Sequence, residues 1–383
     1  MRREFVWSVA TILAAALCAN REVEAKNSIQ SVSVRPEFFN PSLGQTSTLS
    51  VHLSVPSAVT LRILDRDNYV IRSLPPVSLP AGESNLTWDG KDESGAVVPN
   101  EAYCVNLRAL ATDGTKSEYA PSRDFFRVLS DPKRSYSMVS GVLRYELAGP
   151  SRVHIQAGEA VPVGDPKDGK RDGPVLKTIV DREPRTGGVV VETWDGYDES
   201  RTVHIPSLKN FAISILGESL PPATIITVGS RGETFRKYAA RTRQAKTPLY
   251  PPSSHAVHMA GMQHGNLTAL DDFSPELTVR LTGKKDDQGR IEVGGSAVAV
   301  TVQMAPGDAG LFVRPEGALD VFVDEKLIDR KNGASNPESF SIPAAKLPTG
   351  EHRVTVNWVS NHGPTSAQVV RVFKKEAMKE AAR

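Results

Sequence analysis

The chain contains very little cysteine: only Cys18 and Cys104 occur among its 383 residues. Cys18 lies in an N-terminal segment that we expect to be removed, so Cys104 has no partner for an intramolecular disulfide in the mature chain. This excludes a disulfide-stabilised scaffold, and the fold must depend on an apolar core. Cys104 alternates out of phase with Tyr103 and Val105, which we assign to the core, so we predict a half-buried thiol.

The sequence also lacks an excess of charge of one sign and any recognisable catalytic motif. Lys plus Arg number 46 and Asp plus Glu 44, a formal net charge of +2 that gives no general drive toward nucleic acid. The serine-nucleophile elbow, the His-Glu-x-x-His helix, phosphate-binding glycine loops, the dinucleotide fingerprint and the haem-attachment motif are absent. We therefore predict a protein that is not an enzyme and does not bind nucleic acid.

Long apolar stretches are missing except near the N-terminus. A basic start at Met1–Arg3 precedes the apolar run Val9–Ala19, and small residues follow at Val23–Ala25. This order is typical of a secretory signal peptide over residues 1–25. A membrane anchor is the alternative, but the run is shorter than the ~20 residues that a span requires. Because no later segment resembles a span, we expect an exported protein that is periplasmic, outer-membrane-associated or extracellular.

Glycine and proline are plentiful, with 29 and 27 residues, which favours turns and short elements. Between the turns, apolar residues alternate with polar ones, for example at Leu49, Val51 and Leu53. Alternation with a period of two predicts strands that bury one face. Asp67-Asn68 separates two such runs and predicts a hairpin turn. About seven short strands in roughly 100 residues describe a β-sandwich.

A repeat is visible within the first 230 residues. Trp88–Ser94 (Trp-Asp-Gly-Lys-Asp-Glu-Ser) recurs as Trp194–Ser200, an offset of 194 − 88 = 106, whereas Pro56–Leu61 matches Pro150–Ile155 at 150 − 56 = 94. The growing offset predicts an insertion in the second copy, read as a longer hairpin loop near residues 161–173. The acidic loops lack the ligand spacing of a calcium loop. We predict structural turns in which Trp packs on the sandwich and Asp caps backbone amides.

Several of these residues carry a family resemblance. Phe39-Asn40-Pro41, Val59–Ile63, Leu86–Gly90 and Tyr103 together resemble the Ig-like domain of the flagellar hook-capping (FlgD) family. The resemblance implies an Ig-like sandwich of a kind that recurs as a module in exported bacterial proteins. Hook capping itself is not implied, because the chain has a secretory signal and no recognisable scaffolding segment.

The resemblance covers about residues 31–112 well and residues 136–228 less closely. In the second copy Phe211 stands where Tyr103 stands in the first, and Arg201 replaces Gly95. These departures weaken the match of the turn but not the prediction of a second sandwich.

Residues 273–375 return to the alternating pattern. Leu319, Val321 and Val323 lead into a turn at 324–326, and Val354, Val356 and Trp358 alternate later. We therefore predict an all-β chain of three Ig-like β-sandwiches in series after the signal peptide. The expected organisation is a signal peptide at 1–25, sandwiches at 29–128, 129–230 and 273–375, a connector at 231–272, and a charged tail at 376–383.

The expected connector begins with a cationic strip in which aromatic residues are interleaved. Such a strip fits an anionic partner, such as a polysaccharide, lipid head groups or the acidic face of a protein. The alternative is a solvated linker between sandwiches. The candidate binding residues are Arg231, Phe235, Arg236, Lys237, Tyr238, Arg241, Arg243, Lys246 and Tyr250.

The same connector contains a histidine and methionine cluster. Three of the eight histidines and two of the six methionines fall within residues 254–264. Imidazole and thioether ligands together favour copper, particularly Cu(I), over calcium or magnesium. A protein contact and a plain covering loop are the alternatives, because Met at helical spacing is often used for packing. The candidate copper ligands are His255, His258, Met259, Met262 and His264.

Taken together, these patterns predict a non-enzymatic exported protein of tandem Ig-like modules. It would act in assembly, adhesion or protein–protein interaction at the bacterial envelope or cell surface, with an envelope or surface protein as its partner. No resident cofactor is required. A periplasmic copper-binding protein and a polysaccharide-binding accessory protein are the alternatives.

Overall fold

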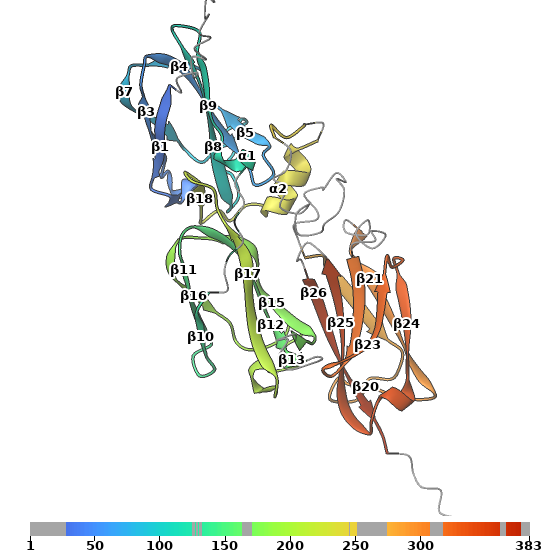
Figure 1. Ribbon diagram of the computed structural model, residues 1–383. Coiled ribbons are helices and arrows are strands. Elements are labelled where there is room, and N and C mark those ends of the chain that lie inside the picture. The colour runs from blue at the N-terminus through green and yellow to red at the C-terminus, as the bar shows by residue number, and fades with distance from the viewer. Residues whose placement is uncertain are drawn as a thin grey trace, which may run out of the picture.

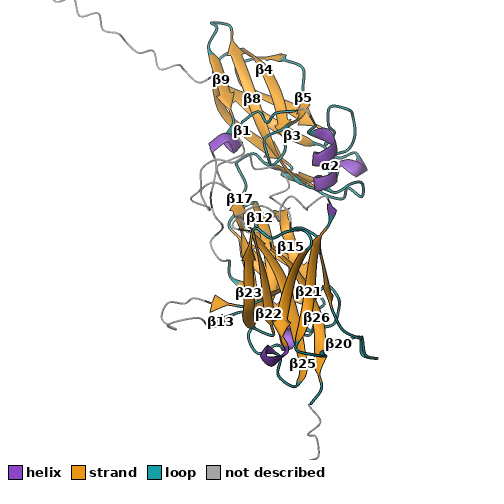
Figure 2. Cartoon of the chain, turned by 90° about the vertical axis from the view of Figure 1, so that its right-hand side faces the viewer, coloured by secondary structure: helices purple, strands orange, loops and turns teal. Residues whose placement is uncertain are grey.

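The computed structural model describes residues 28–124, 127, 129, 132–162, 171–244, 246–250, 274–306, 317–360 and 365–376. These residues form three β-sandwiches, the second below the first and the third beside the second (Figure 1). The prediction of an all-β chain of Ig-like sandwiches is confirmed. Strands dominate and helices are short, as Figure 2 shows. The predicted signal peptide lies outside the described residues.

The first sandwich is built from the predicted alternating segments. Side chains of Leu49, Val51 and Leu53 on one sheet meet those of Val59 and Leu61 on the other in its core. One sheet has the order β1-β3-β7, and the other has β2-β18-β8-β4-β5, with β6 on β4 and β9 on β8. The bounds are β1 Ile29–Arg35, β2 Phe38–Phe39, β3 Ser47–Leu53, β4 Ser57–Leu64, β5 Val70–Ser73, β6 Val77–Leu79, β7 Gly82–Trp88, β8 Ala102–Ala111 and β9 Lys116–Tyr119, with a 3-10 turn at Pro41–Leu43.

This first sandwich is completed by residues that follow the second one. After the short helix α1 (Pro121–Asp124) the chain leaves, and it returns as β18 (Ile225–Thr227). β18 runs parallel to β2 and antiparallel to β8. Helix α2 (Phe235–Thr242) then packs against the same sandwich. The structure thus differs from the expected division at residue 230, because strand pairing returns the chain to the first core.

The second sandwich has the strand plan of the first. Its sheets have the orders β10-β11-β16 and β15-β12-β17. A small hairpin follows β12 at the place of the insertion expected near residues 161–173. The bounds are β10 Arg134–Ser137, β11 Val142–Leu147, β12 Ser151–Glu159, β13 Val161–Pro162, β14 Arg171–Asp172, β15 Val175–Arg185, β16 Gly188–Thr193 and β17 Phe211–Ser219, with a 3-10 turn at Ile205–Ser207.

The two Trp-Asp-Gly loops are the structural turns that the sequence predicts. The Trp88 indole Nε1 donates to the Lys91 carbonyl at 3.0 Å, and the Trp194 Nε1 donates to the Tyr197 carbonyl at 2.9 Å. Asp92 Oδ1 accepts from the amides of residues 94 and 96, and Asp198 Oδ1 accepts from those of residues 202 and 203. In both loops a carboxylate replaces the missing backbone partners of the turn.

The third sandwich follows the alternation predicted for residues 273–375. The turn at 324–326 joins β22 to β23, with Asp324 at a φ of 50°. The sheets have the orders β19-β21-β24 and β20-β26-β25-β22-β23. The bounds are β19 Leu277–Leu281, β20 Ile291–Glu292, β21 Ala297–Met304, β22 Gly317–Val323, β23 Lys326–Asn332, β24 Glu338–Pro343, β25 Gly350–Ser360 and β26 Thr365–Lys374, with a 3-10 turn at Ala344–Lys346.

A buried ionic cluster joins the first and second sandwiches. Glu101 of the first accepts from Arg66 Nε at 2.9 Å and from Arg152 Nη1 of the second at 2.6 Å. Both arginines also donate to the carbonyl of Arg182. Burial opposes ionisation of Glu101, but the charges of Arg152 and Arg66 outweigh it and lower its pKa. A buried charge with good partners fixes the geometry of its neighbours, because breaking one contact leaves the others unpaired.

Buried polar contacts also join the second and third sandwiches. The Asn357 side chain accepts from the Val175 amide at 3.0 Å and donates to its carbonyl at 2.7 Å. Arg353 Nη2 contacts Glu159 Oε2 at 2.6 Å, and Val369 packs into the core of the second sandwich. Every residue of β12 is buried, because one face lies in its own core and the other faces neighbouring parts of the chain. The second sandwich is therefore held on both sides.

No helix among the described ranges is both long enough and apolar enough to cross a membrane.

Candidate binding surface

The cationic strip of the sequence folds as helix α2 and an extended tail, residues 246–250. Thr234 caps the helix, its Oγ1 accepting from the Lys237 amide at 3.4 Å. Phe235, Tyr238 and Ala239 fall on one helical face, at i, i+3 and i+4, and are buried in the core of the first sandwich. The strip is thus amphipathic, and its aromatic face is the one that packs.

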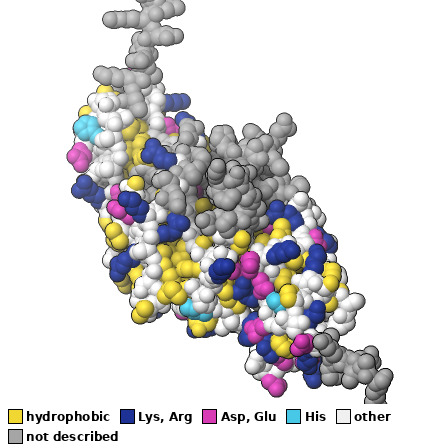
Figure 3. All heavy atoms as spheres, turned by 60° about the horizontal axis from the view of Figure 1, so that its bottom comes forward, with side chains coloured by type: hydrophobic (Ala, Val, Ile, Leu, Met, Phe, Trp, Pro, Cys, Tyr) yellow, Lys and Arg dark blue, Asp and Glu magenta, His cyan; other side chains and the backbone are white. Residues whose placement is uncertain are grey.

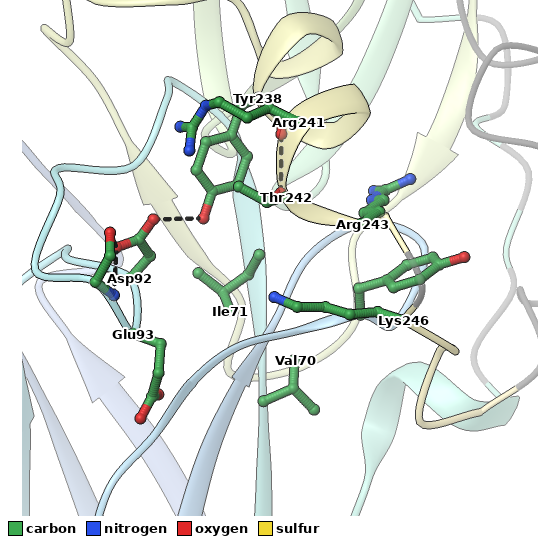
Figure 4. A pocket seen from close by; sticks show the side chains of 11 residues that line it. Val70, Ile71, Asp92, Glu93, Tyr238, Arg241, Thr242, Arg243 and Lys246 are labelled. Atoms are coloured by element: carbon green, nitrogen blue, oxygen red, sulfur yellow. Dashed lines mark hydrogen bonds between the residues drawn. The ribbon is translucent and has the colours of Figure 1, made fainter.

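Tyr238 fastens α2 to the first Trp-Asp-Gly loop. Its hydroxyl donates to Asp92 Oδ2 at 3.1 Å (Figure 4). Burial of Asp92 opposes ionisation, but hydrogen bonds from Ser94, the Ala96 amide and Tyr238 outweigh it and lower its pKa. Burial and the Asp92 charge in turn raise the pKa of Tyr238. The helix is therefore held by a charge-assisted hydrogen bond as well as by apolar packing.

Arg243 fastens the end of α2 to the hairpin between β4 and β5. Its guanidinium donates to Asp65 Oδ2 at 3.0 and 2.7 Å and pairs with Asp67 at 2.6 Å. The same group lies 4.6 Å from the centre of the Tyr69 ring, a cation–π contact. Burial raises the pKa of Asp65 although Arg243 opposes this, and the two acidic partners raise the pKa of Arg243 against its own burial. Arg243 is therefore an anchor and not a free cation.

Tyr250 fastens the tail to β8 and β9. Asn106 Nδ2 donates to its hydroxyl at 2.8 Å, and the hydroxyl donates to Glu118 Oε1 at 2.7 Å. Its ring packs on Leu64 and Cys104. Cys104 is 6% exposed, so the prediction of a half-buried thiol is wrong. Tyr250, 146 residues later in the chain, covers the outer side of β8. Burial raises the pKa of this thiol to about 11, so it is an unreactive group.

A pocket of about 150 Å³ lies between α2, β5 and the first Trp-Asp-Gly loop. Its floor is Val70 and Ile71, and Lys246 extends across it with Asp92 and Glu93 on the far side (Figure 4). The pocket is small and carries charges of both signs. The remaining lining residues are Tyr69, Ser94, Tyr238, Arg241, Thr242 and Arg243.

The nine residues of the strip thus have different positions. Phe235, Tyr238 and Tyr250 are covered, whereas a ring that stacks on a sugar must present an open face. Arg241 is exposed and pairs with Glu233, and Arg236 is half-buried. Within the described ranges, the remaining cations have no ion-pair partner and are exposed; these are Arg231, Lys237 and Lys246. Binding of an anionic partner by this strip remains a prediction. The exposed cations are available for such a partner, whereas the buried aromatic rings are not.

The predicted copper ligands His255, His258, Met259, Met262 and His264 lie outside the described residues, so copper binding also remains a prediction. In the described part of the chain, no group of three or more His, Cys, Asp or Glu side chains is placed to hold a metal ion.

Sequence reasoning missed the acidic partners of the strip. Asp65 lies 178 residues before Arg243, and Asp92 lies 146 residues before Tyr238. Nothing local marks these pairs. The helical spacing of Phe235, Tyr238 and Ala239 was the available signal, since an apolar stripe at i, i+3 and i+4 indicates a packed face.

Comparison with known proteins agrees with this fold for part of the chain. Residues 40–113 match the family model of the FlgD Ig-like domain. The "Basal-body rod modification protein FlgD" of Salmonella typhimurium is 40% identical over 70 residues, 18% of this chain and 29% of that protein, and the Salmonella typhi protein matches equally. The match spans less than a third of those relatives' length.

Similarity to solved structures is weak. The Clostridium thermocellum CbhA fibronectin(III)-like modules align with 92% of this chain and 98% of theirs at 12% identity and a TM-score of 0.20. The tetra-tandem repeat of a large adhesion protein aligns with 89% of this chain and 73% of its own at 16% identity and a TM-score of 0.20. The family model, and not these structures, confirms over residues 40–113 the resemblance to the flagellar hook-capping Ig-like domain that was predicted from Phe39 to Tyr103.

Proposed function

We propose that this chain is a non-enzymatic exported protein of Ig-like modules that acts in assembly, adhesion or protein–protein interaction at the bacterial envelope or cell surface. The observation that carries the proposal is the FlgD Ig-like match at residues 40–113 within a row of three sandwiches. Ig-like sandwiches present sheet edges and end loops as contact surfaces. A fold alone does not assign a function, so the contact surface must be argued from its residues.

The junctions support a role in holding surfaces at fixed positions. Arg66, Glu101 and Arg152 join the first and second sandwiches, and Asn357 joins the third to Val175. Flexible linkers leave domains free to move, whereas buried polar contacts of this kind favour one relative placement. A partner bound to one sandwich would therefore be held at a defined distance from one bound to another.

The exposed cations of the α2 region are the first candidate contact surface. Arg231, Lys237 and Lys246 are exposed beside the packed helix. On the face shown in Figure 3, basic and acidic side chains are interspersed over the third sandwich, so that face offers no comparable excess of one sign. An acidic surface on an envelope protein is the partner that the α2 cations fit best.

The test is capture of an envelope partner by chemical cross-linking to the mature chain, residues 26–383. A charge-reversed variant, R231E/K237E/K246E, is compared with K284E/K285E/K326E, which makes the same change on exposed lysines of the third sandwich. We expect one defined partner to be lost in the first variant and kept in the control. Retention on an immobilised polysaccharide instead, surviving high salt, would favour the sugar-binding alternative. Failure to capture a partner with either protein would contradict the proposed role in protein–protein interaction.

A further inference from the structure

The free edge of the second sandwich differs from that of the first in one chemical respect. The sheets β1-β3-β7 and β10-β11-β16 correspond, and β7 and β16 are edge strands of them. Trp88 ends β7 and Trp194 directly follows β16, so residue 83 corresponds to 189 and residue 85 to 191. Glu83 and Asn85 point outward from β7, whereas Val189 and Val191 point outward from β16, with 70% and 46% of their surfaces exposed.

Charged residues on an edge strand normally prevent pairing with another chain. Glu83 supplies that protection in the first sandwich, while β16 replaces it with exposed β-branched side chains that favour strand pairing. The opposite edge of the same sheet, β10, is polar, with Arg134, Ser135 and Ser137. Only one edge of this sheet is therefore apolar, which favours a closed pair over an open-ended fibre.

The backbone of β16 also has donors and acceptors directed outward. The Trp194 amide donates to the Gly141 carbonyl of the β11 side at 2.8 Å. Because backbone amides alternate in direction along a strand, those of Val190 and Glu192 also point toward β11, whereas those of Val189 and Val191 point to the free edge. Among the described residues nothing pairs with that edge. β16 lies on the side of the second sandwich away from the third (Figure 1).

Charge complementarity identifies the occupant. On the outward face, Arg144 of β11 lies beside Val191 and Glu146 lies beside Val189. Both are exposed, and neither has an ion-pair partner in the described part of the chain. If β16 pairs antiparallel with β16 of a second copy about Val190, Val191 of one copy meets Val189 of the other. Four neighbouring side chains then form a row across the two sheets: Arg144 and Val191 of one copy, followed by Val189 and Glu146 of the other.

We propose that β16 pairs with β16 of a second copy of this chain, antiparallel about a two-fold axis through Val190, and so forms a homodimer. The same patch serves both chains, as a two-fold interface requires. The inference goes beyond the proposed function, and the two fail separately because dimerisation is measured without any other protein. A six-residue strand offers less than the ~800 Å² per partner of a standard interface. We therefore expect a dissociation constant in roughly the micromolar range.

Sedimentation equilibrium of the mature chain over a wide concentration range tests this. The wild type should dimerise. V189E/V191N, which introduces the residues of the first sandwich, should weaken the dimer by about a hundredfold, since each of the two apolar rows would receive one carboxylate. The matched control V77E/L110N introduces the same two residues at exposed apolar positions of the first sandwich and should leave the dimer intact.

Two further variants separate strand pairing from general stickiness. V191P keeps an apolar side chain but removes an edge donor that β11 does not use, so it should fold and remain monomeric. R144E should weaken the dimer and the exchange R144E/E146R should restore it, because the exchange recovers one charge of each sign in every row. A wild type that stays monomeric, or a dimer unchanged by V189E/V191N, would overturn the proposal. Near-ultraviolet circular dichroism checks that each variant is folded.

Discussion

The first and second sandwiches share a strand plan and a tryptophan turn, but among the described residues only the first turn is hydrogen-bonded to a helix from elsewhere in the chain. Asp92 of the first turn accepts a hydrogen bond from Tyr238 of α2, whereas the Asp198 carboxylate accepts hydrogen bonds from Ser200, Thr202 and Val203 of its own loop. Trp88 is 1% exposed and Trp194 is 7% exposed. A turn of this kind is therefore complete by itself, and the packed helix adds stability without defining the fold.

The largest effect is expected from removing the two tryptophans. Trp88→Ala leaves a cavity beside Phe39 and Tyr103, whose rings lie 5.8 and 5.3 Å away, and should cost about 3–5 kcal/mol. Trp194→Ala should cost less, because Trp194 is slightly less buried, at 7% exposed against 1% for Trp88. Chemical denaturation of the full chain, followed by tryptophan fluorescence and circular dichroism, gives both values. Equal costs would show that the covering of the first turn is energetically irrelevant.

A smaller effect is expected where α2 meets the first turn. Tyr238→Phe keeps the ring in the core but removes the hydrogen bond to the Asp92 carboxylate, and should cost about 1.5–3 kcal/mol. Ser200→Ala, which removes a local partner of Asp198 in the more open second turn, is the matched control and should cost less. Hydrogen exchange of the α2 amides locates the loss, and unchanged protection of α2 would contradict the expectation.

A pH effect should appear at the end of the covering segment. Burial opposes ionisation of Glu118, but hydrogen bonds from Arg108, Tyr250 and Asn106 lower its pKa to about 2. Its contribution, about 1 kcal/mol of local stability, is therefore present above the unfolded pKa of about 4.3 and is lost as the pH falls toward 2. Cys104, the single thiol of residues 26–383, reports the opening when titrated with dithiodipyridine. In Glu118→Gln the acid-induced rise in reactivity should flatten, and an unchanged pH profile would exclude Glu118 as its cause.

The smallest effect is expected at the one turn position where the copies differ in backbone preference. Gly95 has a φ of +82° and open space around its missing Cβ, and Arg201 takes the corresponding position at +56°. Arg201→Gly removes left-handed strain but also a salt bridge to Asp195, so it should change stability by less than about 1 kcal/mol. Gly95→Ala should destabilise by about 1 kcal/mol. Thermal unfolding of the pair measures both, and a larger loss in Arg201→Gly would assign a structural role to the salt bridge.

Much of each sandwich could be predicted from the sequence because its determinants are local. Alternation located β3, β4, β22 and β25, and the repeated Trp-Asp-Gly loops gave turns with the expected capping by Asp92 and Asp198. The return of β18 to the first sandwich could not be predicted, since three residues pairing with strands more than 100 positions earlier leave no periodic signal. The cationic strip illustrates a second limit. From the sequence alone, Tyr238 and Tyr250 could either contact a ligand at the surface or pack into the protein. They pack because their hydroxyls bond to Asp92 and Glu118, which are distant in the sequence.

The edge of the second sandwich illustrates a third limit. A run such as Val189-Val190-Val191 indicates a strand buried on both faces. In the structure the outer two valines are exposed, because they lie on the uncovered face of their sheet, as Arg144 and Glu146 of the central strand β11 also do. Sequence patterns give the chemistry of a strand but not whether the outer face of its sheet is covered, and here that covering decides between core and contact surface.

The interrupted path of the first sandwich has a consequence for how the chain acquires its structure. About 100 residues separate α1 from β18. During synthesis from the N-terminus, the first core therefore stays incomplete until the residues of the second sandwich have also been made. Closure of the second sandwich brings residues 124 and 225 near each other and shortens the search for the last strand. Formation of the second module should therefore precede, and kinetically promote, completion of the first, reversing the order of synthesis.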